Sequence, residues 1–192
     1  MEQVLFDYLA QYIALNADEK QAIIDLNIFK QYKKGDILLS EGDHSDEGYF
    51  VIKGCIRSYF IIDGEEKTTA FYTEAESLEP HCKITKKPSA YFVSCVEDAI
   101  LIVANSGMEE TIFAQFPKFE SLCRILSEEL LVKNQTDFDS FKTSSPELRY
   151  MHLMENRPDL LQRVPQYQIA SYLGITAQSL SRIRSRILEN KA

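Results

Sequence analysis

The sequence predicts an α+β protein in which a domain of short β-strands lies between helical segments. Three observations predict this class. Apolar residues recur with helical spacing before residue 28, the period changes to two from Phe29 to about residue 104, and helical spacing returns after Pro117. The chain has 192 residues, 45% of them hydrophobic, which is enough for one larger core and a smaller one.

Two helices are expected before the sheet, at residues 1–14 and 17–27, with Asn16 as the N-cap of the second. The strands follow as short apolar runs separated by turn signals such as "KKGD" and "DG". The runs are "FKQY", "DILLS", "GYFVI", "CIRSYFII", "KTTAFYT", "SAYFVSCV" and "AILIVA". Evenly spaced short strands of this kind are typical of a sandwich, barrel or jelly roll.

Helices resume after the last strand, where Ser106 and Glu109 have capping-box spacing. The longest helical pattern runs from Pro117 to about Phe141. Its apolar stripe is broad and comprises Phe119, Leu122, Cys123, Ile125, Leu126, Leu130, Leu131 and Val132. We interpret it as a helix that docks on the sheet domain with one side and pairs with a second copy of the chain with the other. The residues predicted for this dimer helix are Phe119, Leu122, Leu126 and Leu130. The alternative is a helix packed wholly against its own domain.

Charge is distributed unevenly along the chain, whose net charge is −8. Residues 163–192 carry a local charge of +4, because Glu189 alone opposes Arg163, Arg182, Arg184, Arg186 and Lys191. The rest of the chain therefore carries −12. A basic end on an acidic body suits a protein that presents that end to a polyanion.

Several classes of protein and of site are disfavoured by the sequence. No apolar run approaches the roughly 20 residues that a membrane span requires, and the N-terminus lacks a secretory pattern. We expect a cytoplasmic protein with no membrane partner. The cysteines form no CxxC pair and have no histidine at metal-ligand spacing; they are Cys55, Cys82, Cys95 and Cys123. We therefore expect no disulfide framework, no metal site and no evident cofactor.

The stretch "VPQYQIASYLGITAQSLSRIRSRI", residues 164–187, has the spacing of two short helices joined by a turn. Gly174 supplies the permissive turn residue, and Thr176 caps the second helix. The first helix turns Ile169, Ala170 and Leu173 inward, and the second buries Leu180, Ile183 and Ile187. Ahead of this unit, Ser145 is predicted to cap a further helix, with Pro146 at its first position and Pro158 just past its end.

The opposite face of the second helix carries Gln178, Ser179, Arg182 and Arg186. Short polar groups near the N-terminus of a helix let its backbone approach the DNA major groove, and cationic arms behind them reach bases and phosphates. The pattern predicts a helix-turn-helix; the alternative is an ordinary helical hairpin. The predicted DNA-binding residues are Thr176, Gln178, Ser179, Arg182, Arg184 and Arg186.

Taken together, "KKGDILLSEGDHSDEGYFVIKGCIRSYF", the long helix and "IASYLGITAQSLSRIR" resemble the Crp/Fnr family of bacterial transcription regulators over nearly the full chain. The last motif is similar to the form found in Bacteroidetes members. The resemblance implies a double-stranded β-helix of the cyclic-nucleotide-binding type in residues 1–116, a dimerisation helix in 117–142 and a helix-turn-helix domain in 143–192. It also implies a homodimer that binds double-stranded DNA, and it makes RNA polymerase a candidate partner. The family usually adds a β-wing after the recognition helix. Because this sequence ends at Ala192, we expect wing contacts to be missing.

The resemblance also bears on the ligand. Family members that bind cyclic AMP carry a Gly-Glu pair for the ribose hydroxyl and an Arg-Ser or Arg-Thr pair for the phosphate. The corresponding segment is "ESLEPHCKITKKPSA", in which Pro88 takes the arginine position. Proline offers a phosphate neither charge nor an N–H, and lysines would act only as point charges. We therefore do not expect cyclic AMP. The predicted pocket takes another small ligand or none, and its residues are Glu79, Lys86, Lys87 and Ser89.

Two other functions stay open at this point. Jelly-roll barrels also host metal enzymes, which need histidines and carboxylates converging at the barrel mouth. Only His44 and His81 lie in the strand segment, so we do not expect an enzyme. A sensor that acts through protein contacts would keep the sheet domain, but it has no need for Gln178 and Arg182 on one helical face.

Overall fold

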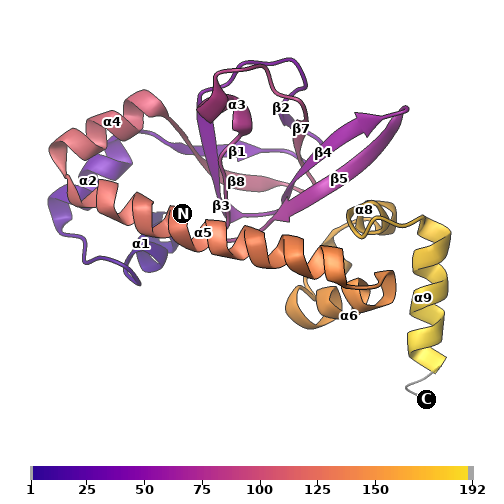
Figure 1. Cartoon of the computed structure of the whole chain (residues 1–192). Helices are drawn as coiled ribbons and strands as arrows, with labels where there is room; N and C mark the ends of the chain where they lie inside the picture. The colour runs from indigo at the N-terminus through magenta and orange to yellow at the C-terminus, as the bar shows by residue number, and fades with distance from the viewer. Residues whose placement is uncertain (1, 190–192) are drawn as a thin grey trace.

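The computed structural model describes residues 2–189, and Figure 1 shows how they are arranged. The sheet domain lies above the long helix α5 (Lys118–Thr143) in that view, with three shorter helices at one end of it. These three are α1 (Glu2–Leu9), α2 (Ala17–Asp25) and α4 (Ser106–Gln115). At the other end of α5 lies a group that we call the C-terminal unit: α6 (Pro146–Asn156), α7 (Leu160–Arg163), α8 (Gln166–Tyr172) and α9 (Ala177–Glu189).

Two antiparallel sheets of four strands each form the sheet domain within residues 2–189. One sheet has the order β1 (Phe29–Tyr32), β8 (Ala99–Asn105), β3 (Glu47–Lys53) and β6 (Ser77–Leu78). The other has the order β2 (Ile37–Leu39), β7 (Phe92–Cys95), β4 (Ile56–Ile62) and β5 (Glu65–Tyr72). Both contribute to a core whose most buried members include Leu39, Val51, Ile56, Val93 and Leu101. The predicted jelly-roll class is confirmed.

The N-terminal helices are shorter than the sequence pattern predicts. Helix α1 ends at Leu9, and residues 10–12 form a turn. Asn16 caps α2 as predicted: its side chain accepts from the Glu19 N–H at 2.9 Å, and the Glu19 carboxylate accepts from the Asn16 N–H at 2.8 Å. This reciprocal pair satisfies two backbone N–H groups that the helix leaves unpaired.

The sequence pattern misplaced one helix cap and missed two short elements. The N-cap of α4 is Asn105, whose side chain accepts from the Met108 N–H at 2.9 Å, and Ser106 is the first helical residue. Ser106 instead donates its hydroxyl to Asp46 at 2.8 Å. The segment after β5 also contains a strand and a helix that the sequence reading did not resolve, β6 and α3 (His81–Thr85).

The N-terminal turns of α5 pack into the sheet domain's own helices. Phe119 and Leu122 are 5% and 3% exposed in a cluster with residues of α1 and α2. They cannot form the surface of a dimer helix, because their side chains are already enclosed within one protomer. Leu126 and Leu130 are only half-buried. The most exposed apolar side chains of α5 are Leu131, Val132 and Phe138, at 68%, 65% and 59%.

The C-terminal unit begins as predicted, with Ser145 accepting from the Leu148 N–H at 3.3 Å and Pro146 opening α6. Gly174 adopts a left-handed φ of +71° in the turn between α8 and α9, a region that glycine enters without a Cβ penalty. Thr176 caps α9 by accepting from the Ser179 N–H at 3.1 Å. Helix α7 is an addition that the sequence pattern did not predict.

The core of the C-terminal unit continues into the sheet domain. Leu160, Ile169 and Leu180, each 2% exposed or less, belong to a cluster that also contains Cys55 and Phe71 of the sheet domain. Apolar burial of this kind is the dominant favourable term in folding. The two parts are therefore packed together as well as connected by the chain.

Candidate functional site

Helix α9 has one buried and one open face. Leu180, Ile183 and Ile187 recur at helical spacing and are buried in the C-terminal unit. Gln178 and Arg182, one turn apart on the other side, are both exposed, and Ser179 beside them is half-buried. The Ser179 hydroxyl lies 3.0 Å from the Thr176 hydroxyl. The sequence-predicted residues Thr176, Gln178, Ser179 and Arg182 are thus brought together at the N-terminal half of α9.

The remaining predicted cations differ in their surroundings. Arg184 is half-buried. Arg186 is exposed and donates to the Glu147 carboxylate of α6 at 2.9 Å. Arg163, counted with the basic end of the sequence, does not belong to this surface, because it forms ion pairs with Glu74 and Glu97 of the sheet domain. Lys191 lies outside the described residues.

The four residues predicted for the effector pocket do not converge. Lys86 lies in a left-handed turn and pairs with Asp46 at 2.9 Å, and Lys87 is exposed. The Ser89 hydroxyl is buried and donates to the Tyr91 carbonyl at 2.7 Å. Of the four, Glu79 lines a cavity in the sheet domain that the other three do not line. The predicted pocket was wrong because the loop after α3 turns the lysines toward solvent.

The cavity that Glu79 lines lies within the sheet domain and has a volume of about 400 Å³. Hydroxyl groups dominate its polar lining, and α5 contributes at its mouth. The lining residues are Ser58, Phe60, Thr69, Ala70, Tyr72, Ser77, Leu78, Glu79, His81, Tyr91, Leu130 and Asn134. Among the residues that the structure describes, no lysine or arginine lines it.

Glu79 is already engaged by an internal cation. Lys83, 5% exposed, contacts the carboxylates of Glu79 at 2.9 Å and Glu109 at 2.6 Å. Burial lowers the pKa of Lys83, but the hydrogen bonds to the two carboxylates outweigh it and hold the pKa above its usual value. The Glu79 carboxylate also lies directly against β3, since a Cβ at Gly48 would clash with its oxygens. The sequence signal for this arrangement is the separation of four residues between Glu79, which precedes α3, and Lys83 within it.

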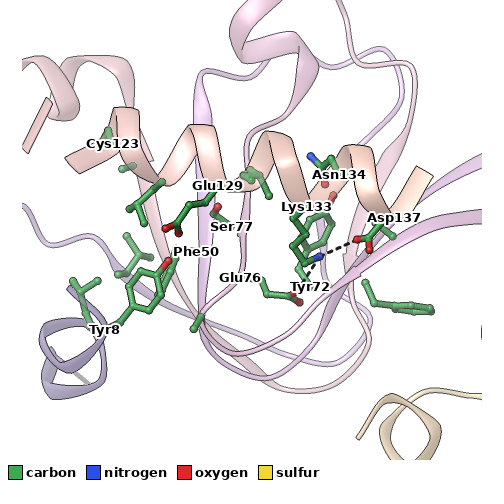
Figure 2. Close-up of a pocket in the computed structure, with 18 of the residues that line it drawn as sticks. Tyr8, Phe50, Tyr72, Glu76, Ser77, Cys123, Glu129, Lys133, Asn134 and Asp137 are labelled. Carbon is green, nitrogen blue, oxygen red and sulfur yellow. Dashed lines mark hydrogen bonds and ion pairs between the residues drawn. The ribbon is translucent and has the colours of Figure 1, made fainter. Parts of the chain in front are cut away.

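A larger groove of about 1000 Å³ runs between α5 and the sheet domain, next to the cavity. Figure 2 shows Glu129 extending from α5 toward Phe50, and Lys133 extending toward Glu76. Lys133 contacts Glu76 at 3.5 Å and Asp137 at 3.2 Å. The cation at the centre of the groove is therefore neutralised by the protein itself.

The sequence profile of the cyclic nucleotide-binding domain matches residues 29–116. The Anaerobic regulatory protein of Haemophilus influenzae is 23% identical over 169 residues, covering 82% of this chain and 65% of the relative. The Transcriptional activator protein Anr of Pseudomonas protegens is also 23% identical, covering 93% of this chain and 78% of the relative. Among solved structures, FixK2 from Bradyrhizobium japonicum has a TM-score of 0.68 at 18% identity, with 85% of each chain covered; this likeness concerns the fold.

The matched domain and these relatives support a regulator of the Crp/Fnr type. The chain spans 65% of the length of the first of these relatives, slightly less than two thirds. The similarity of the helix-turn-helix motif to the form found in Bacteroidetes members stays a prediction.

The profile that matches residues 29–116 is named for cyclic nucleotides, but the residues that line the cavity do not fit such a ligand. A cyclic phosphate needs a cationic partner when it leaves water, and the described lining of the 400 Å³ cavity contains no lysine or arginine. The carboxylate that would accept from a ribose hydroxyl is held by Lys83.

Two further observations limit the chemistry. Within residues 2–189, no helix is both long and apolar enough to span a bilayer. In the same part of the chain, no cluster of three or more His, Cys, Asp or Glu side chains is arranged to hold a metal ion.

Proposed function

We propose that the protein is a DNA-binding transcription regulator that acts as a homodimer and reads DNA with α9. The observation that carries this proposal is the open polar face of α9, where Gln178 and Arg182 are exposed one turn apart and Ser179 lies beside them. The family and the names of its relatives support the same function.

Each residue of this face has a proposed role. The small side chains of Thr176 and Ser179 let the N-terminus of α9 approach the floor of the major groove. Gln178 and Arg182 contact base edges, because amide and guanidinium groups can form two hydrogen bonds to one base. Arg184 and Arg186 contact phosphates, and Arg186 exchanges its exposed pair with Glu147 for a phosphate oxygen.

The dimer forms through the exposed part of α5. Leu131 and Val132 lie more than half exposed one to two turns before Phe138, and neighbouring apolar side chains on an open helix are typical of a helix that pairs with another. This seam lies nearer the C-terminal end of the helix than the sequence predicted. A twofold dimer presents two α9 helices to two half-sites.

The sheet domain binds a small ligand other than a cyclic nucleotide, or acts without one. The cavity of about 400 Å³ is within the size range of small-molecule sites. RNA polymerase is a candidate partner once the protein is bound at a promoter.

The test is unbiased selection of DNA fragments, followed by titration of the selected site and of random DNA at several salt concentrations. We expect one enriched palindromic sequence, tighter binding to it than to random DNA, and affinity for both that falls as salt rises. Absence of any enriched sequence together with salt-independent binding would reject the proposal and favour a sensor that acts through protein contacts.

A further inference from the structure

The C-terminal unit is tied to the sheet domain by two arginines that meet acidic side chains at the edge of the shared core. Arg163, at the end of α7, donates to both carboxylate oxygens of Glu74, from Nη1 at 2.8 Å and from Nη2 at 2.9 Å. Its Nε donates to Glu97 at 2.9 Å. A guanidinium held by two parallel hydrogen bonds and a third partner has a fixed direction as well as a favourable charge.

The second arginine makes a similar connection one helix earlier. Arg157, just after α6, donates from Nη2 to Glu76 at 2.9 Å and to the Thr73 hydroxyl at 2.8 Å. Glu76 in turn accepts from the Thr73 N–H at 2.8 Å. Both arginine side chains are largely buried, at 25% and 22% exposed, so solvent screens these pairs less than it screens fully exposed ones.

These contacts do not cover the face of α9 proposed to read DNA. Gln178 and Arg182 remain exposed while the arginine pairs are intact, and in Figure 1 α9 projects from the C-terminal unit away from the sheets. The contacts therefore fix where α9 lies without blocking it. Arg149 adds a second anchor to the same unit, because its guanidinium stacks on Phe141 of α5 and donates to the Leu173 carbonyl.

We infer that Arg157 and Arg163 are positioning residues for DNA recognition: through Glu74, Glu76 and Glu97 they hold α8 and α9 in one orientation relative to the sheet domain and α5. This inference rests on the proposed function. Two half-sites lie one helical turn of DNA apart, roughly 34 Å, and both α9 helices must match that spacing at once. A C-terminal unit that is free to rotate must be ordered on binding, which weakens the specific complex more than contacts with random phosphates.

A rival role for Arg163 is direct contact with a DNA phosphate, and the acidic partners separate the two roles. The double variant Glu74→Gln, Glu97→Gln leaves Arg163 in place but removes its two carboxylate partners in the sheet domain, so that only the weaker contact with Asp159 of the C-terminal unit, at 3.5 Å, remains. A phosphate-contacting arginine freed in this way would bind both DNAs more tightly. If Arg163 is a positioning residue, loss of these carboxylates should lower the affinity for the selected site, as Arg163→Gln is expected to do.

The experiment titrates wild type, Arg163→Gln, Arg157→Gln and the acidic double variant against the selected site and random DNA. We expect the affinity of each variant for the selected site to fall about tenfold, which is the scale of one or two charge-assisted hydrogen bonds. Its affinity for random DNA should fall less than about twofold. Arg163→Lys keeps the charge without the two-pronged geometry and should recover part of the lost preference. Amide hydrogen exchange should become faster in α7 and α8 in all the variants.

Two controls isolate positioning from charge and from stability. Lys33→Gln removes one cation from an exposed pair with Asp98 on the sheet domain, and Ile23→Val lowers stability through the separate core around α1 and α2. Both should keep the wild-type ratio of specific to random binding. An unchanged ratio in the arginine and acidic variants, or tighter binding of both DNAs by the acidic variant, overturns the inference while leaving the proposed function in place. Wild-type protein that binds no DNA overturns both.

Discussion

The Ser171 hydroxyl of α8 donates a hydrogen bond of 2.9 Å to the Glu66 carbonyl of β5. The same oxygen accepts from the Thr68 N–H at 2.9 Å, so one side chain pairs two backbone groups on the outer edge of the strand. Strand β5 is the last strand of its sheet, and its Thr69, Ala70 and Tyr72 line the 400 Å³ cavity. Strand β5 therefore lines the cavity and also contacts the C-terminal unit.

Replacing Ser171 with alanine should lower the free energy of unfolding by roughly 1 kcal/mol, because it leaves the partly buried Thr68 N–H without its partner. Urea unfolding measures this loss. Ser181→Ala, at an exposed position of α9, is the matched control and should change stability by less than about 0.5 kcal/mol. Equal stability of the two variants would show that water replaces the Ser171 hydroxyl without loss.

Replacing Arg182 with alanine should weaken the free energy of binding to the selected DNA by on the order of 1–3 kcal/mol. The loss on random DNA should be much smaller, because a contact with a base edge depends on the DNA sequence. Arg184→Ala should weaken both DNAs about equally and flatten the salt dependence by about one counterion per half-site. Titration of each variant against both DNAs at several salt concentrations distinguishes the two patterns. Equal weakening by Arg182→Ala would place the reading contact elsewhere on α9.

The double variant Leu131→Glu, Phe138→Glu should be monomeric, because it places like charges in an apolar seam between two α5 helices. Both side chains are exposed in the protomer, so the variant should keep its fold by circular dichroism. Light scattering reports the mass. Leu148→Glu, which changes an exposed leucine on α6, should remain dimeric. A folded, dimeric double variant would move the seam away from this part of α5.

Cyclic AMP at millimolar concentration should leave the melting temperature unchanged, since a ligand that does not bind the native state cannot stabilise it. The physical reason is the absence of lysine and arginine among the described residues that line the cavity. Thermal unfolding across a cyclic AMP titration measures this. A saturable upward shift would mean that the phosphate finds a cation, with Lys83 released from Glu79 as the nearest source.

Acid should remove the contribution of the Glu74–Arg163 pair to stability. Burial raises the pKa of Glu74, but the hydrogen bonds from Arg163 and from the Gly54 N–H outweigh it and lower the pKa below its usual value. A lowered pKa in the folded state contributes stability above the unfolded pKa, about 4.3, and that stability is lost as pH falls through the folded pKa. The stability difference between wild type and Glu74→Gln should therefore be largest near neutral pH and shrink below about pH 4. A constant difference in urea unfolding across this range would contradict the assignment.

Local signals predicted most elements of the fold. Asn16, Ser145 and Thr176 cap the helices that they were expected to cap, because a capping hydrogen bond joins residues two or three apart and needs no distant partner. The open face of α9 follows from its helical period in the same way. Ser106 was wrong as a cap because its neighbour Asn105 ends β8 in an extended conformation and its side chain takes that position.

Contacts between distant residues could not be predicted. The sequence marks Lys86 and Lys87 as cations near Glu79, but the turn at Lys86 carries them outward, and Lys83 from α3 meets the carboxylate instead. Arg163 looks like part of a basic end in the sequence, yet its partners lie 66 and 89 residues earlier in the chain.

The sequence by itself therefore determined the α+β class, the capped helices and the polar face of α9, because these depend on spacing along a few turns or strands. Only the tertiary structure decided which cations stay available, which side of α5 is enclosed, and what lines the cavity. Those outcomes depend on which distant carboxylates and apolar surfaces meet each side chain when the sheets and helices pack. The spacing of residues within one helix or strand does not predict such contacts.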